Sequence, residues 1–286
     1  RRLGSGTESH FSWCQPRPRI HSPGSARDAA AATRSTTSFQ LRAPFSLEEV
    51  ASSKYITFME RGLPNLFALG YRVGVGASAH ADRWTLAGSV LGNSIGDPSE
   101  GLREEGLSVS GRATYLAWRD GDSLGHLGAS LAYQDLSGVD SVRLRARPES
   151  HVTDVRYIDT GELEDVDDQW SGGVEAAALK GPFSVQGEYI RSSLDLDDRW
   201  HHFSGWYLYG SWFLTGESRP YNEKKGAFGR VKPFSKWGAL EFAVRYSHAD
   251  LSDHRVLGGE EDILTIGLNW YVRRNMRLML NYLRIR

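Results

Sequence analysis

The clearest pattern in the chain is Leu264-Thr265-Ile266-Gly267-Leu268-Asn269-Trp270. Large apolar side chains stand at the even positions, and threonine, glycine and asparagine stand at the odd ones. Successive side chains of a β-strand point to opposite faces, so this segment predicts a strand with one apolar and one polar face. The same alternation recurs at 84–90, 107–115, 127–133 and 240–247. Because roughly a dozen such segments and no clear helical run are present, we predict an all-β fold.

Alternation alone does not separate a soluble β-sandwich from a membrane barrel, because both have a period of two. Three further features favour the barrel. The segments run for about nine to twelve residues, which suits tilted membrane-spanning strands. Aromatic side chains such as Trp118 and Trp270 lie at segment ends. Tight turns such as 180–182 alternate with longer connections, which we place at 93–105, 159–171 and 194–201. We therefore predict an antiparallel transmembrane β-barrel.

The composition excludes several classes of protein. A net charge of −1 does not indicate a generally basic nucleic-acid binder, so no nucleic-acid partner is expected. The single cysteine, Cys14, excludes a disulfide framework and a cysteine-rich metal site. His201 and His202 would point to opposite faces of a strand, so they predict no metal site. No nucleophile-elbow, Walker or dinucleotide-binding motif stands out, and we expect neither an enzyme nor a cofactor.

The pattern changes near residue 36. Residues 1–36 hold serine, proline, arginine and alanine without any period, and we interpret them as disordered or as a translation artefact. Residues 37–286 carry the alternating segments and form the predicted barrel domain. The first residues, beginning Arg1-Arg2-Leu3, have no apolar signal-peptide core, so a mature chain or a fragment is expected.

The segment Val142-Arg143-Leu144-Arg145-Ala146-Arg147 is the strongest candidate site. In a strand, Arg143, Arg145 and Arg147 share one face. Facing lipid, each would cost about 2–4 kcal/mol at mid-depth, so we place them toward the lumen as a ladder of forked anion sites. The alternative is a basic strand end that lies at the membrane surface or pairs with the acidic 161–168 loop.

Four more arginines fall in the same inward register: Arg72, Arg112, Arg245 and Arg277. Each one alone could be a wall residue held by a lumenal glutamate such as Glu188 or Glu241. As a set they predict a positive lumen, which would concentrate anions and exclude cations.

The segment Phe58-Met59-Glu60-Arg61 lies in a stretch of about twenty residues between strands, and a connection that long is usually functional or disordered. It is too apolar for a solvated loop, so we predict that it folds into the barrel as a constriction. Arg61 would lie near the narrowest point with Glu60 as its partner. The alternative is a packing plug without ligand contacts.

Several motifs resemble the phosphate-selective porin O and P family. They are Phe203–Glu217, Pro44–Glu49, Ile56–Arg61 and Gly267–Tyr271, and the resemblance runs from about Phe39 to Arg286. It implies a sixteen-stranded antiparallel barrel, of which roughly twelve strands are expected here. It also implies a homotrimer in the outer membrane of a Gram-negative bacterium, with inward-folded loops and rows of arginines. The family's first strands and its aromatic-ended closing strand are expected to be missing.

The expected function is passive, anion-selective diffusion of phosphate or polyphosphate, with inorganic phosphate or other small anions and the lipid and lipopolysaccharide membrane as partners. Two alternatives remain open. One is a general small-solute porin without phosphate specificity, and the other is an outer-membrane barrel without a transport role.

Overall fold

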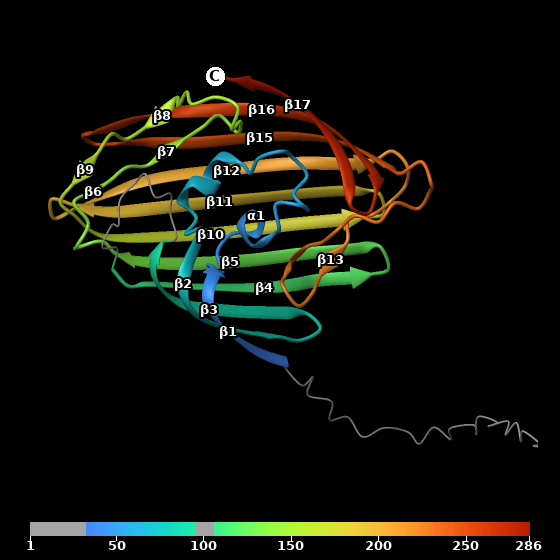
Figure 1. Ribbon diagram of the computed structural model, residues 1–286, viewed down its shortest axis with the longest axis horizontal. Coiled ribbons are helices and arrows are strands. Elements are labelled where there is room, and N and C mark those ends of the chain that lie inside the picture. The colour runs from blue at the N-terminus through green and yellow to red at the C-terminus, as the bar shows by residue number, and fades with distance from the viewer. Residues whose placement is uncertain (1–32, 95–105) are drawn as a thin grey trace, which may run out of the picture. The chain divides into compact units, whose positions relative to one another are not determined.

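The computed structural model describes residues 33–94 and 106–286. It contains one 11-stranded sheet in the order β1-β2-β3-β4-β5-β10-β11-β12-β15-β16-β17 (Figure 1), with every neighbouring pair antiparallel. The strands are β1 (Thr33–Arg42), β2 (Tyr71–His80), β3 (Trp84–Ser94), β4 (Ser108–Asp120), β5 (Ser123–Asp135), β10 (Val166–Lys180), β11 (Phe183–Leu196), β12 (Arg199–Phe213), β15 (Ala239–Asp253), β16 (Val256–Arg273) and β17 (Met276–Ile285). The all-β prediction is confirmed. Within the described residues the sheet is not closed, since β1 and β17 are its edges.

The two faces of the sheet are inverted relative to a soluble protein. On β16, Ile266, Leu268 and Trp270 are 38%, 41% and 43% exposed, whereas Thr265 and Asn269 are fully buried. A soluble sandwich would bury the apolar set. Apolar residues facing outward and polar residues facing inward are the arrangement of a membrane barrel, so the barrel interpretation is confirmed.

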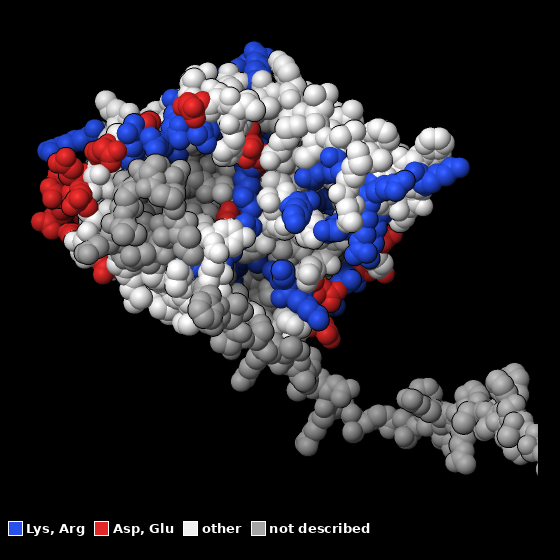
Figure 2. Space-filling view, in the orientation of Figure 1, with Lys and Arg blue, Asp and Glu red and all other residues white. Residues whose placement is uncertain are grey.

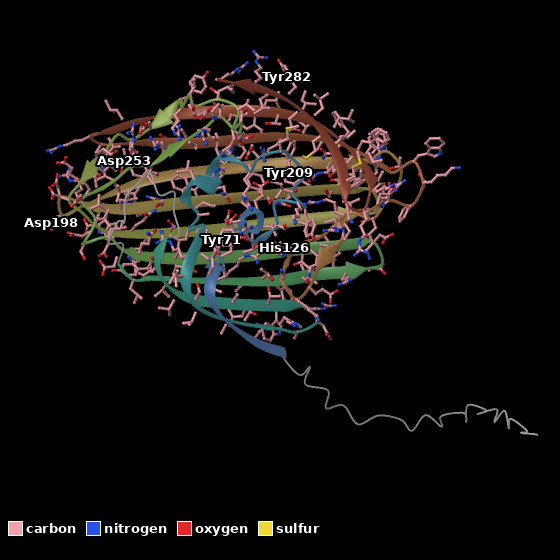
Figure 3. The ribbon with its side chains drawn as sticks, in the orientation of Figure 1. Tyr71, His126, Asp198, Tyr209, Asp253 and Tyr282 are labelled. Carbon is pink, nitrogen blue, oxygen red and sulfur yellow. The ribbon has the colours of Figure 1, made fainter. Side chains whose placement is uncertain are left out.

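The strands are long, and tight turns join neighbouring strands at both ends of the sheet. The strands of the 11-stranded sheet from β4 to β16 have 13 to 18 residues, which suits a tilted membrane crossing. Asp197 and Asp198 form the β11–β12 turn with φ of 54° and 57°, a conformation that aspartate tolerates. Figure 3 labels Asp198 and Asp253 at the same end of the sheet. No helix among the described residues is long and apolar enough to cross a membrane.

The predicted connections need correction. Residues 194–201 are not a loop, because β11 and β12 extend to Leu196 and from Arg199. The connection predicted at 159–171 instead covers 136–165, since the alternating pattern of β10 already begins at Val166. Most of the connection predicted at 93–105, and residues 1–32 of the predicted N-terminal segment, lie outside the described residues.

Three connections fold over the inner face of the sheet. The β1–β2 connection, residues 43–70, contains α1 (Leu47–Val50) and the 3-10 helix η1 (Leu63–Phe67), which contacts β11, β12 and β15. The β5–β10 connection, residues 136–165, contains β6 (Ser141–Val142), β7 (Arg145–Ala146), β8 (Ile158–Asp159) and β9 (Leu163–Glu164). The β12–β15 connection, residues 214–238, contains β13 (Tyr221–Asn222) and β14 (Ala227–Phe228).

The buried apolar core lies between these connections and the inner wall. Phe45 and Phe67 from the first connection pack in one cluster with Leu144 and Ile158 from the second and Phe203 from β12. Because the connections and the inward positions of the strands both contribute buried apolar side chains, the core fixes the connections against the wall while the outer face keeps its apolar side chains exposed.

Candidate anion-binding site

Residues 142–147 do not form a membrane-spanning strand, so the predicted arginine ladder on a barrel strand is wrong. Val142 pairs with Leu163 in the β6–β9 ladder, and Arg145 pairs with Asp159 in the β7–β8 ladder. The predicted alternation is present, with Leu144 buried and Arg145 exposed. The physical reason is that the apolar face packs on the core of the connection instead of on lipid.

Arg143 is held by acidic residues of the same connection. Its Nε and Nη2 donate to Asp159 Oδ1 and Oδ2 at 2.7 and 2.6 Å, and its Nη1 lies 3.4 Å from Glu162 Oε1. This pairing raises the pKa of Arg143 and lowers the pKa of Asp159. The alternative, pairing with the acidic 161–168 loop, describes only the longer contact of Arg143 with Glu162, because its closer partner Asp159 lies outside that loop.

Arg145 and Arg147 meet Arg61 across a pocket of about 320 Å³ between the two connections. Arg61 comes from 43–70, and Arg145, Arg147 and Arg156 come from 136–165. Arg147 Nη2 donates to Asp154 Oδ1 at 2.9 Å. Three of the predicted site residues thus come together, and Arg156 is a fourth that the prediction did not include.

Four arginines line this pocket together with two carboxylates, Glu60 and Glu149, so positive groups outnumber negative ones in its lining. Burial, and then the neighbouring charges of Arg145 and Arg147, lower the pKa of Arg156. Like charges held this close repel one another, and an anion between them removes that repulsion. Guanidinium groups remain charged at any physiological pH and present forked donors to phosphate or carboxylate. Figure 2 shows a group of blue side chains over the β7–β8 region of the face in view, with red side chains beside it and at the left edge.

The partner predicted for Arg61 is wrong. Arg61 Nε lies 3.4 Å from Glu49 Oε2, and its Nε and Nη2 donate to the carbonyls of Glu48 and Ala51 at 2.9 and 3.2 Å. Glu60 instead lies 2.8 Å from His151 Nδ1. The reason is local, because 43–70 turns back on itself around α1 and brings Glu49, not the adjacent residue, to the guanidinium.

Arg112 is an inward-facing wall residue held by a glutamate. It is 5% exposed, and its Nε and Nη2 donate to Glu175 at 2.5 to 3.1 Å. Its Nη2 also donates to the Gly226 carbonyl at 2.7 Å. Arg112 therefore faces inward, as its register predicted. It also fits the alternative in which such an arginine is a wall residue held by a glutamate.

Arg245 has a similar environment. It is 1% exposed, and its Nη2 donates to Glu149 Oε2 at 2.5 Å while its Nη1 lies 3.4 Å from Glu48 Oε1. The sequence suggested Glu188 or Glu241 as partners of such arginines. The partner of Arg245 comes instead from a connection, which strand register alone does not locate.

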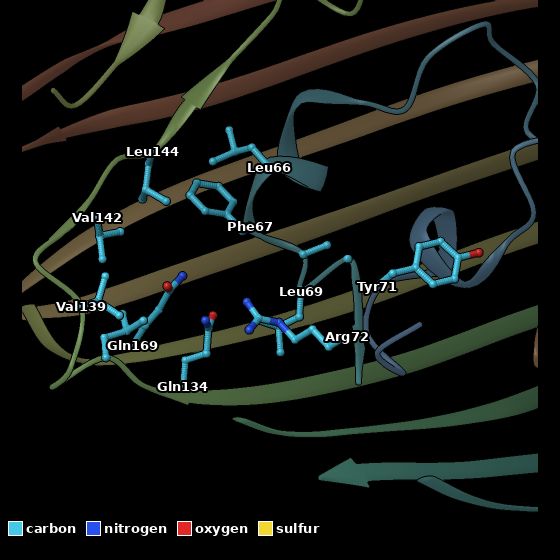
Figure 4. Close-up of a pocket in the computed structure, with 13 residues that line it drawn as sticks. Leu66, Phe67, Leu69, Tyr71, Arg72, Gln134, Val139, Val142, Leu144 and Gln169 are labelled. Atoms are coloured by element: carbon cyan, nitrogen blue, oxygen red, sulfur yellow. The ribbon is translucent and has the colours of Figure 1, made fainter. Parts of the chain in front are cut away.

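Arg72 lies at a different pocket, of about 220 Å³, beside Gln134 and Gln169. Figure 4 shows these polar side chains on one side and Val142, Leu144 and other apolar side chains on the other. Arg72 is inward and 7% exposed, as its register predicted.

Arg277 lies on the edge strand β17, where it donates to the Ile56 carbonyl at 2.6 Å. With Lys54, Arg230, Arg273 and Arg274 it lines a pocket of about 450 Å³ whose described lining contains no carboxylate. Arg277, Arg72, Arg112 and Arg245 are therefore distributed over the inner face and do not form one cluster with Arg145 and Arg147.

The predicted inward-folded loop packs closely on the wall. Phe58 is fully buried, makes an edge contact with Tyr209 at 5.4 Å between ring centroids and lies 4.4 Å from the Arg245 guanidinium. Met59 is 49% exposed. Figure 3 labels Tyr209 among the central strands. This contact holds 43–70 over the interior, while its role as the narrowest point stays a prediction.

Sequence reasoning missed how the connections are anchored. Glu188 accepts hydrogen bonds from the backbone N–H groups of Leu47 and Glu48, both at 2.8 Å. Arg219, in 214–238, is 7% exposed and lies 3.7 Å from the Phe228 ring centroid. The available signal was Ser46 followed by two glutamates, which is typical of a helix start. Nothing in that local pattern names Glu188.

Adjacent histidines behave as expected, with His201 buried and His202 exposed on β12. Within the described residues, one group has donor atoms close enough to hold a metal ion, namely His248, Glu260 and Asp262. His248 is directly opposite Asp262 on neighbouring strands, with Nδ1 3.0 Å from Oδ1. This cross-strand pair is separate from the arginine pocket.

Comparison with known proteins assigns the family. A family model described as phosphate-selective porin O and P matches residues 28–286. An uncharacterized protein of Caulobacter vibrioides is 33% identical over 256 residues, covering 84% of this chain and 51% of that protein. Porin O of Pseudomonas aeruginosa is 27% identical over 278 residues, covering 84% of this chain and 62% of that protein. The chain thus spans about half to three fifths of these relatives. It belongs to the phosphate-selective porin O and P family.

Proposed function

We propose that the protein is an outer-membrane channel for passive, anion-selective diffusion, with phosphate or polyphosphate as its solute. Family membership supports an outer-membrane porin of Gram-negative bacteria, a homotrimer as its assembly and a channel in place of an enzyme. The observation that carries the choice of solute is the pocket in which Arg61, Arg145, Arg147 and Arg156 converge.

The pocket has the properties that conduction requires. Its arginine forks replace part of the hydration shell of an oxyanion, which favours entry. Arg145 is exposed and the side chain of Arg147 is 30% exposed, so water competes for the same groups and the anion is released. A site that is both attractive and partly hydrated passes anions without trapping them.

Planar-bilayer conductance of the full-length protein tests this function. The reversal potential in a chloride gradient should show anion preference, and added phosphate should block the chloride current. Arg145→Ala should weaken that block. Arg143→Ala is the matched control, because Arg143 lies in the same segment but is locked onto Asp159. Cation preference would contradict the channel proposal, and equal loss of block in both variants would contradict the role of the pocket.

A general porin without phosphate specificity is the second candidate, and one observation favours it. Among the described residues the buried glutamates outnumber the buried arginines by eight to four. The glutamates are Glu48, Glu49, Glu149, Glu175, Glu188, Glu217, Glu241 and Glu261, and the arginines are Arg72, Arg112, Arg219 and Arg245. These counts favour a neutralised wall with local basic pockets over the predicted positive lumen. Equal chloride conductance with and without phosphate would select this candidate.

A further inference from the structure

One guanidinium on the barrel wall contacts both inward connections. Arg245, on β15, donates from Nη2 to Glu149 Oε2 at 2.5 Å, and Glu149 belongs to 136–165. Its Nη1 donates to the Glu60 carbonyl at 3.0 Å and to Glu48 Oε1 at 3.4 Å, both in 43–70. The same guanidinium lies 4.4 Å from the centroid of the Phe58 ring. Arg245 is 1% exposed, so water does not substitute for these contacts.

The carboxylates of Glu149 and Glu48 also accept hydrogen bonds from groups other than Arg245. Glu149 Oε1 accepts a hydrogen bond from the Leu63 N–H at 3.1 Å. Leu63 is the first residue of η1 and belongs to 43–70. Glu149 Oε2 accepts from Thr265 Oγ1 on β16 at 3.1 Å, and the Ser247 hydroxyl donates to Oε1. Glu48 Oε2 accepts from the Gly62 N–H at 2.8 Å. The two connections are therefore tied to the wall and to each other through one buried network.

This network lies directly beside the basic pocket in sequence and in space. Arg61 precedes Gly62, whose N–H is bound by Glu48, and Arg147 is two residues before Glu149. Gly62, Leu63 and Glu149 also line the pocket. Since one wall of the pocket comes from each connection, the separation of the arginines depends on the contacts that fix the connections.

We infer that Arg245 is a positioning residue that holds both connections in place and so sets the spacing of the arginines in the pocket. It does not bind the anion itself, because its two terminal nitrogens already face Glu149, Glu48 and the Glu60 carbonyl, and its Nε, which has no hydrogen-bond partner, is buried. Removing one member of a buried ion pair leaves the other charge unpaired, and the connection that carries it then moves toward water. This inference rests on the proposed function only for its conductance test.

The phosphate block in planar bilayers distinguishes a positioning role from direct anion binding, because the two roles predict opposite changes in the block for Glu149→Gln. Arg245→Met and Glu149→Gln should each weaken the phosphate block by about tenfold. The block in the double variant should be no weaker than in the more affected single variant, because both substitutions break the same buried network. If Arg245 binds the anion, Glu149→Gln frees its guanidinium and strengthens the block. A strengthened block in Glu149→Gln, or additive losses in the double variant, would overturn the inference.

Limited trypsin digestion of the folded, detergent-solubilised protein gives a readout independent of transport. Arg245→Met should accelerate cleavage after Lys54 and Arg61 in 43–70. Arg112→Met is the matched control, because it removes an equally enclosed arginine that instead contacts the carbonyls of Lys225 and Gly226 in 214–238. That control should accelerate cleavage after Lys224 and Lys225 only.

The conductance and digestion experiments test the proposed solute and the proposed role of Arg245 separately. If phosphate does not block the unmodified channel, the proposed solute is wrong, but the digestion pattern still decides the role of Arg245. Unchanged cleavage at Lys54 and Arg61 in Arg245→Met would overturn the positioning role whatever the channel conducts. Glu149→Gln, which alters a connection and not the wall, serves the same test if Arg245→Met does not fold.

Discussion

Replacing Glu175 by leucine should destabilise the barrel strongly, because it leaves Arg112 charged and without its carboxylate inside the protein. The Arg112 and Glu175 side chains are 4% and 2% exposed, and three donor–acceptor distances between them lie between 2.5 and 3.1 Å. Removing one partner of a buried pair costs about 3–5 kcal/mol. The carbonyls of Lys225 and Gly226 stay in contact with Arg112, so we expect the lower end of that range.

The double variant Arg112→Met/Glu175→Leu should recover most of the loss, because no unpaired charge remains. His126 then loses its Nε2 contact to Glu175 Oε1 at 2.8 Å but keeps its Nδ1 contact to the Tyr221 hydroxyl at 2.7 Å, and the carbonyls of Lys225 and Gly226 lose the Arg112 donors. The measurement is the denaturant midpoint of the protein folded in lipid vesicles, followed by tryptophan fluorescence. A cost below about 1 kcal/mol for Glu175→Leu would show that water screens the pair. Arg112 would then be available to anions, and the neutralised-wall interpretation would be wrong.

Three further predictions concern the outer face, the 136–165 connection and the 214–238 connection. Leu268→Arg on the outer face should cost about 2–4 kcal/mol and lower the yield of inserted barrel in vesicles, whereas Leu268→Met should not. Arg143 lowers the pKa of Asp159 below its ordinary 3.8, so their pairing stabilises 136–165 above that pH and is lost as the pH falls through the lowered pKa. Pepsin should therefore cut this connection faster with increasing acidity, and Asp159→Asn should abolish the dependence. Gly226 has φ +56° and an added Cβ would lie 2.5 Å from Thr114 Oγ1, so Gly226→Ala should displace 214–238 and expose it to trypsin, with insertion unchanged.

The sequence by itself determined which side chains of a strand face outward and which face inward. The alternation at 264–270 placed Leu268 outward and Asn269 inward, and the structure has them 41% and 0% exposed. A period of two is a local property of extended backbone, so it is visible without knowing any partner strand. The same rule correctly predicted that Arg72, Arg112 and Arg245 point inward.

The same local rule failed where an alternating segment lies in a connection. Residues 142–147 alternate as a strand does, but their apolar face packs on the core beneath the connection, not on lipid. Period two reports only that two faces differ. What each face meets is decided by tertiary packing, so Arg143 on Asp159 and Arg145 in the pocket were indistinguishable in the sequence.

The partners of the charged residues were decided by the tertiary structure. Arg112 and Glu175 are 63 residues apart, and Arg245 and Glu149 are 96 apart, with no local spacing to link them. A buried charge must be paired, so the sequence determined that inward arginines need carboxylates. Which carboxylates they meet depends on how three connections fold back over the sheet, and that arrangement is fixed only when the connections pack against the wall and each other.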